Sequence, residues 1–172
     1  MLISFAEYIK SLNLEKFFKK LGASDAETLA KGVEHFTTKE AENRDKIVLG
    51  YFGENGVNRI VEATTERLLS APSLQTGSKV LDVGAGSGFF TAKIAERVNR
   101  TVSTVAFYAM DATPAMLLAL EKKKAGITPF LGVAENIEAS IKEARAYAEI
   151  TDKFDAVFST LMLHHSTKPE KV

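Results

Sequence analysis

The 172-residue chain contains no cysteine and no tryptophan, and its 22 Lys and Arg residues balance its 22 Asp and Glu residues. The absence of cysteine excludes a disulfide scaffold, a cysteine-ligated zinc site and a thiol nucleophile. The zero formal net charge argues against a general polyanion binder, because neutralising many phosphates needs a basic surplus. No run approaches the roughly 18 apolar residues of a membrane span, and the N-terminus lacks the pattern of a secretory signal. We therefore expect a soluble, cytoplasmic protein that contacts neither membrane nor nucleic acid.

The remaining composition is that of a globular protein, with 45% hydrophobic and 26% charged residues. The length is sufficient for one domain with a single sizeable core. The pattern of apolar residues changes near residue 75, from helical spacing to alternating strand and helix patterns. We expect a helical segment at residues 1–75 and an α/β part at residues 76–172.

Helix start signals mark the N-terminal segment. An acid follows Ser or Thr by three residues, as in a capping box, at Ser4 with Glu7, Ser24 with Glu27 and Thr37 with Glu40. Apolar residues at helical spacing extend from the first signal to residue 21, and Gly22 is typical of a helix end. One helix is predicted there, and a further helix is predicted over residues 57–69.

Strand and helix patterns alternate in the second part. Short apolar runs predict strands at residues 79–83, 102–110, 127–133 and 154–160, with helices at residues 89–98, 114–124 and 135–148 between them. This alternation is typical of a parallel sheet with helices on its faces. Pro129 within the third run indicates an edge strand.

A glycine-rich loop, GAGSG at residues 84–88, separates the first strand from the next helix. A helix N-terminus preceded by glycines can receive a polar ligand. The spacing differs from the G-x-G-x-x-G of dinucleotide sites, and Asp82 would repel a pyrophosphate but suits a cation. Asp111 follows Gly84 by 27 residues, against about 20 in dinucleotide folds. Its position favours hydrogen bonds from a ribose over the alternative of capping the following turn.

Four motifs in this order resemble the class I S-adenosylmethionine-dependent methyltransferases, especially the small-molecule group. They lie at residues 80–91, 110–117, 132–137 and 154–165. The resemblance implies a Rossmann-like parallel sheet in strand order 3-2-1-4, S-adenosylmethionine as the cofactor, and a helical segment at residues 1–75 that closes over the cofactor as a lid.

The resemblance also implies a set of cofactor-binding residues. Asp82 would act on the methionyl ammonium through water, and Asp111 would hold the ribose hydroxyls. Ala134 would offer its backbone N–H to the adenine, and Ser159 its carbonyl to the ammonium. The complete set is Asp82, Gly84, Ala85, Gly86, Gly88, Asp111, Ala112, Met116, Val133, Ala134, Glu135 and Ser159.

Two departures from the family pattern stand out. Val133 occupies a position where the family often has a carboxylate that reaches the adenine, and Glu135 could substitute for it. The family sheet usually has seven strands, whereas this sequence predicts four. We therefore expect either a truncated form of a longer protein, or self-association or a partner at the exposed fourth strand.

The resemblance implies methyl transfer to a small-molecule acceptor. A catalytically inactive S-adenosylmethionine-binding or assembly module is the alternative, while an aminopropyltransferase or a nicotinamide oxidoreductase fits the motifs less well. Residues 159–162 lack the polar-Pro-Pro-aromatic segment of methyltransferases that act on nucleobase amino groups. No catalytic residue is assigned: His164 and His165 are interpreted as packing or solvated residues. The three histidines show no metal-ligand spacing, so no metal site is expected.

Overall fold

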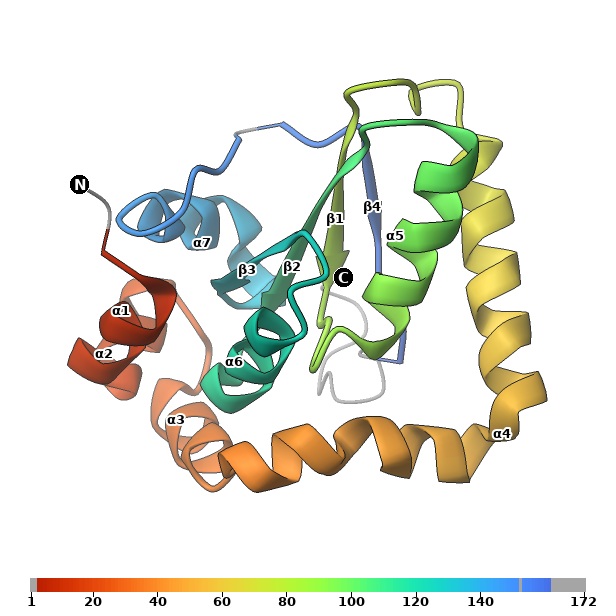
Figure 1. Ribbon diagram of the computed structural model, residues 1–172. Coiled ribbons are helices and arrows are strands. Elements are labelled where there is room, and N and C mark those ends of the chain that lie inside the picture. Colours follow the sequence, from red (N-terminus) through yellow and green to blue (C-terminus); the bar gives the residue numbers. More distant parts are fainter. Residues whose placement is uncertain (1–2, 152, 162–172) are drawn as a thin grey trace.

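The computed structural model describes residues 3–151 and 153–161. Within these residues, four parallel strands form one sheet in the order β3-β2-β1-β4 (Figure 1). The strands are β1 Lys79–Val83, β2 Ala106–Asp111, β3 Ile127–Leu131 and β4 Ala156–Phe158. The predicted strand order and the edge position of the strand with Pro129 are confirmed.

The register brings the carboxyl ends of the strands into one row. Asp82 of β1 lies opposite Ala109 of β2 and Phe158 of β4, and Asp111 of β2 lies opposite Leu131 of β3. The chain winds outward from β1 to β3 and then returns to the other side of β1. Ligands of open parallel sheets bind where the winding direction reverses, outside the carboxyl ends of the strands.

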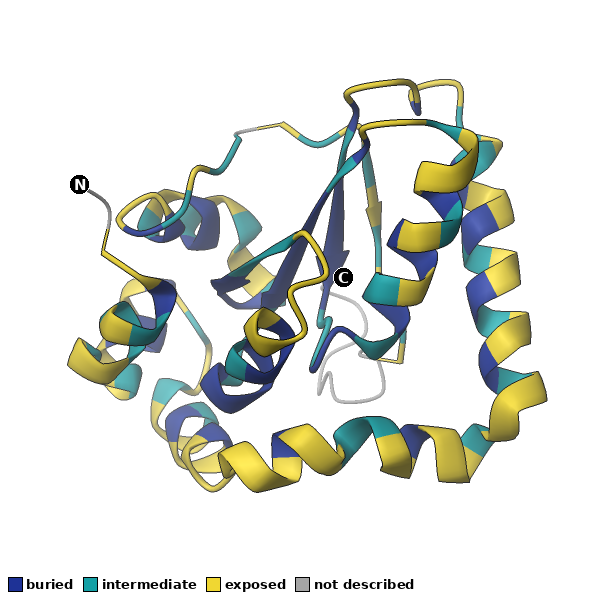
Figure 2. Ribbon diagram, viewed as in Figure 1, coloured by how far each residue is buried: buried dark blue, intermediate teal, exposed yellow. Residues whose placement is uncertain are grey.

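Helices cover both faces of the sheet. Side chains alternate along a strand, so Val80 packs toward α5 (Phe89–Thr101) and the second half of α4 (Thr38–Leu69), whereas Leu81 packs toward the opposite face. Figure 2 shows the buried strands between the two helical layers. The opposite face carries α1 Phe5–Ser11, α2 Leu14–Lys20, α3 Ala26–Glu34, α6 Pro114–Lys122, the short 3₁₀ helix η1 Ala134–Asn136, and α7 Ile137–Ala144.

Helix α4 is bent. Its second half lies beside α5, and its first half passes beneath the carboxyl ends of the strands in the view of Figure 1. The bend falls at Gly53, whose φ of 64° and ψ of 169° interrupt the helical backbone. The start predicted at Thr37 is confirmed, since Thr37 and Glu40 form a capping box, but the predicted separate helix over residues 57–69 is the second half of α4.

The prediction of one helix over residues 5–21 is wrong. Leu12 is extended, with φ −86° and ψ 135°, and separates α1 from α2. The Asn13 side chain accepts a hydrogen bond from the Lys16 N–H and starts the second helix. In α3, likewise, Asp25 rather than Ser24 is the capping residue. Local side-chain caps, which compete with helix continuation, therefore decided both boundaries.

The predicted elements of the α/β part are present with altered ends. Helix α5 continues to Thr101, so β2 begins at Ala106 instead of residue 102. The Asn99 side chain holds the intervening turn, because it accepts from the Val105 N–H at 2.8 Å and donates to the Val105 carbonyl at 3.1 Å. The helix predicted over residues 135–148 is divided between η1 and α7, and β4 is shorter than predicted.

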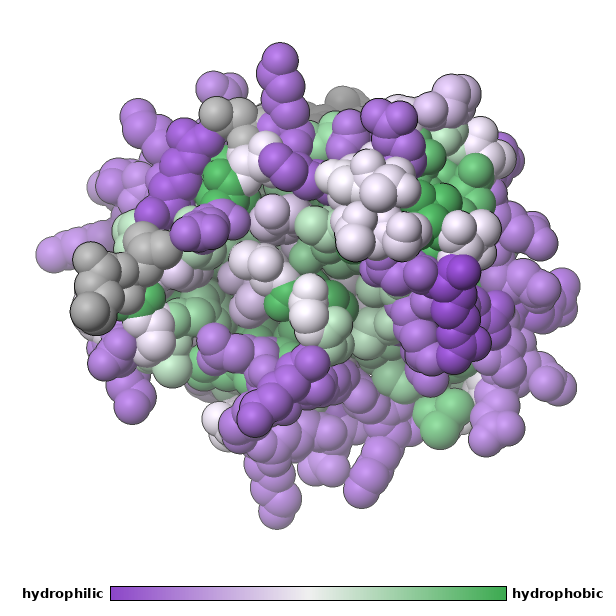
Figure 3. All heavy atoms as spheres, turned by 45° about the horizontal axis from the view of Figure 1, so that its top comes forward, coloured by the Kyte–Doolittle hydropathy of each residue, from purple (hydrophilic) through white to green (hydrophobic). Residues whose placement is uncertain are grey.

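Strand β4 forms the other edge of the sheet, as expected. Its central residue Val157 is 56% exposed, and Phe158 packs partly into the core. What pairs with this edge stays a prediction. No helix in the described ranges is long and apolar enough to cross a bilayer. Figure 3 turns the molecule so that the top of Figure 1 comes forward. On the face seen there, hydrophilic side chains surround less polar residues near the middle.

Candidate functional site

Asp82 is a fully buried carboxylate near the end of β1. The Thr91 hydroxyl of α5 donates to its Oδ2 at 2.6 Å, while its Oδ1 has no hydrogen-bond partner among the described residues. Burial raises the pKa of Asp82 to about 7; the Thr91 hydrogen bond opposes this rise, and the negative charge of Asp111 adds to it. A buried, unpartnered carboxylate oxygen is costly, and a cationic ligand would relieve that cost.

Asp111 ends β2 and is half-buried. Its Oδ2 accepts from the Gly86 N–H at 2.8 Å, and its Oδ1 accepts from the Thr113 N–H at 2.8 Å. Burial raises the pKa of Asp111, and these N–H groups act in the opposite direction. Each carboxylate oxygen can accept more than one hydrogen bond, so Asp111 can organise the loop and the turn and still accept hydrogen bonds from a ligand.

The backbone amides of the glycine loop are largely used within the protein. Gly84 and Ala85 donate to the Met110 carbonyl at 2.8 and 3.1 Å. Gly88 donates to the Ala85 carbonyl at 2.9 Å, and Gly86 donates to Asp111. A phosphate-binding loop instead directs its N–H groups at the ligand. The loop is thus unsuited to a pyrophosphate.

Gly86 and Gly88 adopt left-handed backbone conformations for different reasons. A Cβ on Gly88, at φ 71°, would lie 2.3 Å from Cδ1 of Leu120, so close packing on α6 requires glycine there. A Cβ on Gly86, at φ 56°, would meet nothing within 4 Å. The loop is therefore packed against α6 on one side and leaves space for a ligand beside Gly86.

The first half of α4 contacts this loop, which the sequence reasoning missed. The Ser87 hydroxyl donates to Oδ1 of Asp45 at 2.6 Å, and Lys123 Nζ donates to Oδ2 of Asp45 at 2.6 Å and to the Ser87 carbonyl at 2.8 Å. One turn earlier on α4, Glu42 pairs with Lys122 at 2.6 Å. No local sequence signal links Asp45 to Ser87, because 42 residues separate them.

The other predicted site residues follow neighbouring strands along the same edge. Met116 is buried against Ala41 of α4, and Val133 is buried with its N–H bonded to Oγ of Ser140 at 3.0 Å. The remaining residues are accessible to different extents: Ala112 and Ala134 are half-buried, and Glu135 and Ser159 are exposed. The structure places all the predicted residues at the carboxyl ends of the strands, and their individual roles stay predictions.

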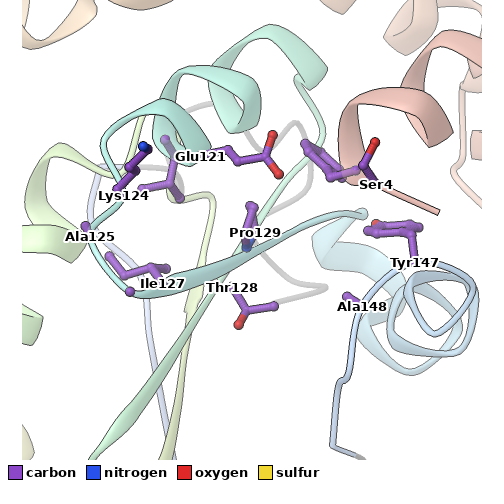
Figure 4. A pocket seen from close by; sticks show the side chains of 12 residues that line it. Ser4, Glu121, Lys124, Ala125, Ile127, Thr128, Pro129, Tyr147 and Ala148 are labelled. Carbon is purple, nitrogen blue, oxygen red and sulfur yellow. The ribbon is translucent and has the colours of Figure 1, made fainter. Parts of the chain in front are cut away.

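Other features lie away from this edge. A hollow of about 380 Å³ opens at the amino end of β3, where Tyr147, Lys124 and Pro129 line it (Figure 4). None of its lining residues is a predicted site residue. In the described ranges, no His, Asp and Glu side chains gather closely enough to hold a metal ion. His35 is exposed at the end of α3, whereas His164 and His165 lie outside the described residues.

Fold and site together define a Rossmann-like domain whose ligand-binding edge carries two buried or half-buried carboxylates. A family described as "Methyltransferase domain" matches residues 80–172, more than half of the chain. The chain belongs to this family and has the Rossmann-like fold of class I S-adenosylmethionine-dependent methyltransferases. The family of protein-L-isoaspartate (D-aspartate) O-methyltransferases matches residues 35–117, a range that includes all of α4.

Individual proteins show the same similarity. The ribosomal RNA small subunit methyltransferase C of Enterobacter sp. (strain 638) is 28% identical over 122 residues, which are 69% of this chain and 30% of that protein. The structure of the CurJ carbon methyltransferase matches 97% of this chain and 45% of its own, with 12% identity and a TM-score of 0.54.

A second solved structure is the phosphoethanolamine N-methyltransferase 2 of Haemonchus contortus in complex with S-adenosyl-L-methionine. It matches 94% of this chain and 32% of its own, with 19% identity and a TM-score of 0.45. The chain thus spans less than half the length of each of these three proteins.

Proposed function

We propose that the protein binds S-adenosylmethionine at the carboxyl edge of its sheet and transfers the methyl group to a small-molecule acceptor. The observation that carries this proposal is Oδ1 of the buried Asp82, which no described residue satisfies, beside a second carboxylate at Asp111. Membership of the methyltransferase domain family supports the same reaction. When bound, S-adenosylmethionine supplies a methyl group that its sulfonium centre already activates.

The residues present fit this cofactor. Its methionyl ammonium is a cation, and the buried Asp82 carboxylate attracts a cation. Its ribose hydroxyls are donors, and Asp111 retains acceptor capacity at an edge where the loop beside Gly86 is open. A pyrophosphate would meet the same two carboxylates and a loop with most amides already bonded. The donor set therefore favours S-adenosylmethionine over a nicotinamide dinucleotide.

The protein's contribution to methyl transfer would be orientation. Asp82 and Asp111 would fix two parts of the cofactor from adjacent strands, which limits the directions in which the methyl group can face. Holding reactants in line is worth several orders of magnitude in rate. Both carboxylates at the ends of β1 and β2 are assigned to the cofactor, so we assign no proton transfer.

The N-terminal segment, residues 1–75, would cover the cofactor as a lid. Ala41 of α4 packs against Met116, which we expect beside the adenine, and the first half of α4 passes beneath the carboxyl ends of the strands. Limited proteolysis with and without S-adenosylhomocysteine tests this role. Bound ligand should slow cleavage between Gly22 and Gly56, and cleavage that ignores the ligand would contradict it.

The acceptor is the least constrained part of the proposal. The equal numbers of acidic and basic residues favour a small molecule over a nucleic acid. An RNA acceptor is the second candidate, because one relative is named as a ribosomal RNA methyltransferase. A cytoplasmic location stays a prediction.

A methyl-transfer assay tests the proposal. The protein is incubated with S-adenosylmethionine labelled on its methyl group and, in separate reactions, with small metabolites, purified ribosomal RNA or no acceptor. We expect labelled product with the small-molecule fraction. Label on RNA alone would establish the second candidate, and cofactor binding without transfer to any acceptor would favour the inactive binding or assembly module.

A further inference from the structure

We propose that Asp45 of α4 is a positioning residue for the glycine loop, which it holds through Ser87 and Lys123 in the shape that receives the cofactor. The inference rests on the proposed binding of S-adenosylmethionine at this loop. It assigns a role in the site to a residue outside the four motifs, on the helix that precedes the sheet.

Ser87 is the loop residue that is hydrogen-bonded to Asp45 of α4 and to Lys123 at the end of α6. It is buried between Gly86 and Gly88, and it is the one loop residue with a polar side chain. Its hydroxyl donates to Oδ1 of Asp45, while its carbonyl accepts from Lys123 Nζ, which also donates to Oδ2 of Asp45. These three bonds close a ring that fixes both the side chain and the backbone of Ser87.

The neighbours of Ser87 explain why this matters for the loop. Gly86 and Gly88 flank it, and both adopt left-handed backbone conformations. Glycine can also adopt many other backbone conformations at little cost. Gly88 also begins α5 without a side-chain cap. External contacts must therefore select the loop conformation: Asp111 holds the Gly86 amide, Leu120 packs against Gly88, and Asp45 fixes the residue between them.

A second ion pair between the same helices provides a matched control. Glu42 and Lys122 are 51% and 61% exposed and form no hydrogen bond with the described loop residues, whereas Asp45 and Lys123 are 31% and 30% exposed. Exposed pairs contribute little, since water screens them. A charged acceptor for a buried hydroxyl contributes more. Neutralising Asp45 should disturb the loop, and neutralising Glu42 should not.

Ligand binding and the α4 contact should also be coupled in both directions. If Asp45 stabilises the binding-competent loop, a ligand that binds this loop must strengthen the contact by the same factor. Bound cofactor would then strengthen the contact between α4, part of the proposed lid, and the glycine loop. This coupling needs no change in the charge of any α4 residue.

The first test measures the loop in the ligand-free protein. Hydrogen–deuterium exchange of residues 84–90 is compared among the wild type, Asp45→Asn and Glu42→Gln. We expect faster exchange in Asp45→Asn and wild-type exchange in Glu42→Gln. Equal exchange in all three proteins would overturn the positioning role, whatever the protein binds. If Asp45→Asn fails to fold, Ser87→Ala replaces it, because that change removes the hydroxyl that donates to Asp45 and leaves the Asp45–Lys123 pair intact.

The second test measures affinity by calorimetry with S-adenosylhomocysteine. We expect about tenfold weaker binding in Asp45→Asn and in Ser87→Ala, and less than about twofold change in Glu42→Gln. The double variant should bind nearly as well as either single variant, because both changes break one contact. Wild-type affinity in Asp45→Asn, or additive losses in the double variant, would overturn the inference. A wild type that binds no ligand would instead refute the proposed function.

Discussion

The ends of β1 and β2 carry one aspartate each, and the two carboxylates differ in their hydrogen bonding and burial. Asp111 accepts backbone N–H groups on both oxygens and helps to shape the glycine loop. Asp82 is buried more deeply, accepts only the Thr91 hydroxyl, and keeps one oxygen without a partner in the described chain. The first carboxylate stabilises the folded state of its surroundings, and the second is tolerated at a cost.

The difference indicates that Asp111 serves the fold of the site, whereas Asp82 is kept for a ligand. A satisfied carboxylate can serve the fold and a ligand together. Burial raises the pKa of both carboxyls, but only Asp82 keeps an oxygen that no described residue satisfies, so a role with a cationic ligand explains its presence. Variants of the two residues should consequently affect stability in opposite directions, while both weaken cofactor binding.

The largest expected effect is that of Asp111→Ala. The change leaves the Gly86 and Thr113 N–H groups without their acceptor and removes the proposed ribose contact. We expect the free energy of unfolding to fall by about 2 kcal/mol and S-adenosylhomocysteine affinity to fall about a hundredfold. Urea unfolding and calorimetry measure the two quantities. His164→Ala is the comparison variant, and an equal or larger loss of affinity there would mean that the cofactor is misplaced.

Asp82→Asn should have the next largest effect and the opposite sign in stability. The amide oxygen can still accept from Thr91, while the buried charge is gone. At pH 8 we expect the variant to be about 2 kcal/mol more stable than the wild type and to bind the cofactor about tenfold less well. A variant that is less stable than the wild type at pH 8 would show that the Asp82 charge already has a partner.

The pH dependence of the wild type sharpens the same comparison. Because burial raises the pKa of folded Asp82 from 3.8 to about 7, the folded state binds this proton more tightly than the unfolded state does. This group's contribution to stability is therefore full below about pH 4 and is lost as the pH rises through about 7. Cofactor affinity should change the other way and rise severalfold from pH 6 to pH 8. Both trends should be weaker in Asp82→Asn, where the raised pKa of Asp111 leaves a remainder of the same sign, as unfolding and binding titrations across this range can show.

Gly86→Ala should have the smallest effect on stability. Its φ of 56° costs about 1 kcal/mol for a residue with a side chain, but the added methyl group meets no atom of the described residues within 4 Å. The methyl group would enter the space that we assign to the ligand beside Asp111. We expect a small loss in unfolding free energy and a clear loss of S-adenosylhomocysteine affinity. Unchanged affinity would place the ligand elsewhere on the loop.

Much of the fold was predictable because its signals are local. The alternation of short apolar runs with helices, together with the four motifs, predicted the strand order, and Pro129 predicted an edge strand. Thr37 and Glu40 predicted their own capping box. The break at Leu12 was missed because the apolar spacing continues through it, although the Asn13 cap is a local signal that could have revealed it.

The candidate site was predictable only in part. The sequence predicted that Asp82, Asp111 and the glycines lie at the carboxyl ends of neighbouring strands. All strands of a parallel sheet point the same way, so residues near the ends of different strands lie at one edge. The contact of Asp45 with Ser87 depends on the bend of α4 and on its packing against α6, which no local pattern encodes. The lack of a partner for Asp82 Oδ1 among the described residues is also a property of packing, and the sequence shows only that a carboxylate is present.

The central claim is that this edge binds S-adenosylmethionine through two unequal carboxylates. Calorimetric titration of the wild-type protein with S-adenosylmethionine, S-adenosylhomocysteine and NAD tests it most directly. We predict binding of the first two ligands and none of NAD, because most amides of the loop are already bonded within the protein and NAD offers no ammonium group to Asp82. Tight binding of NAD with no response to the other two ligands would contradict the account.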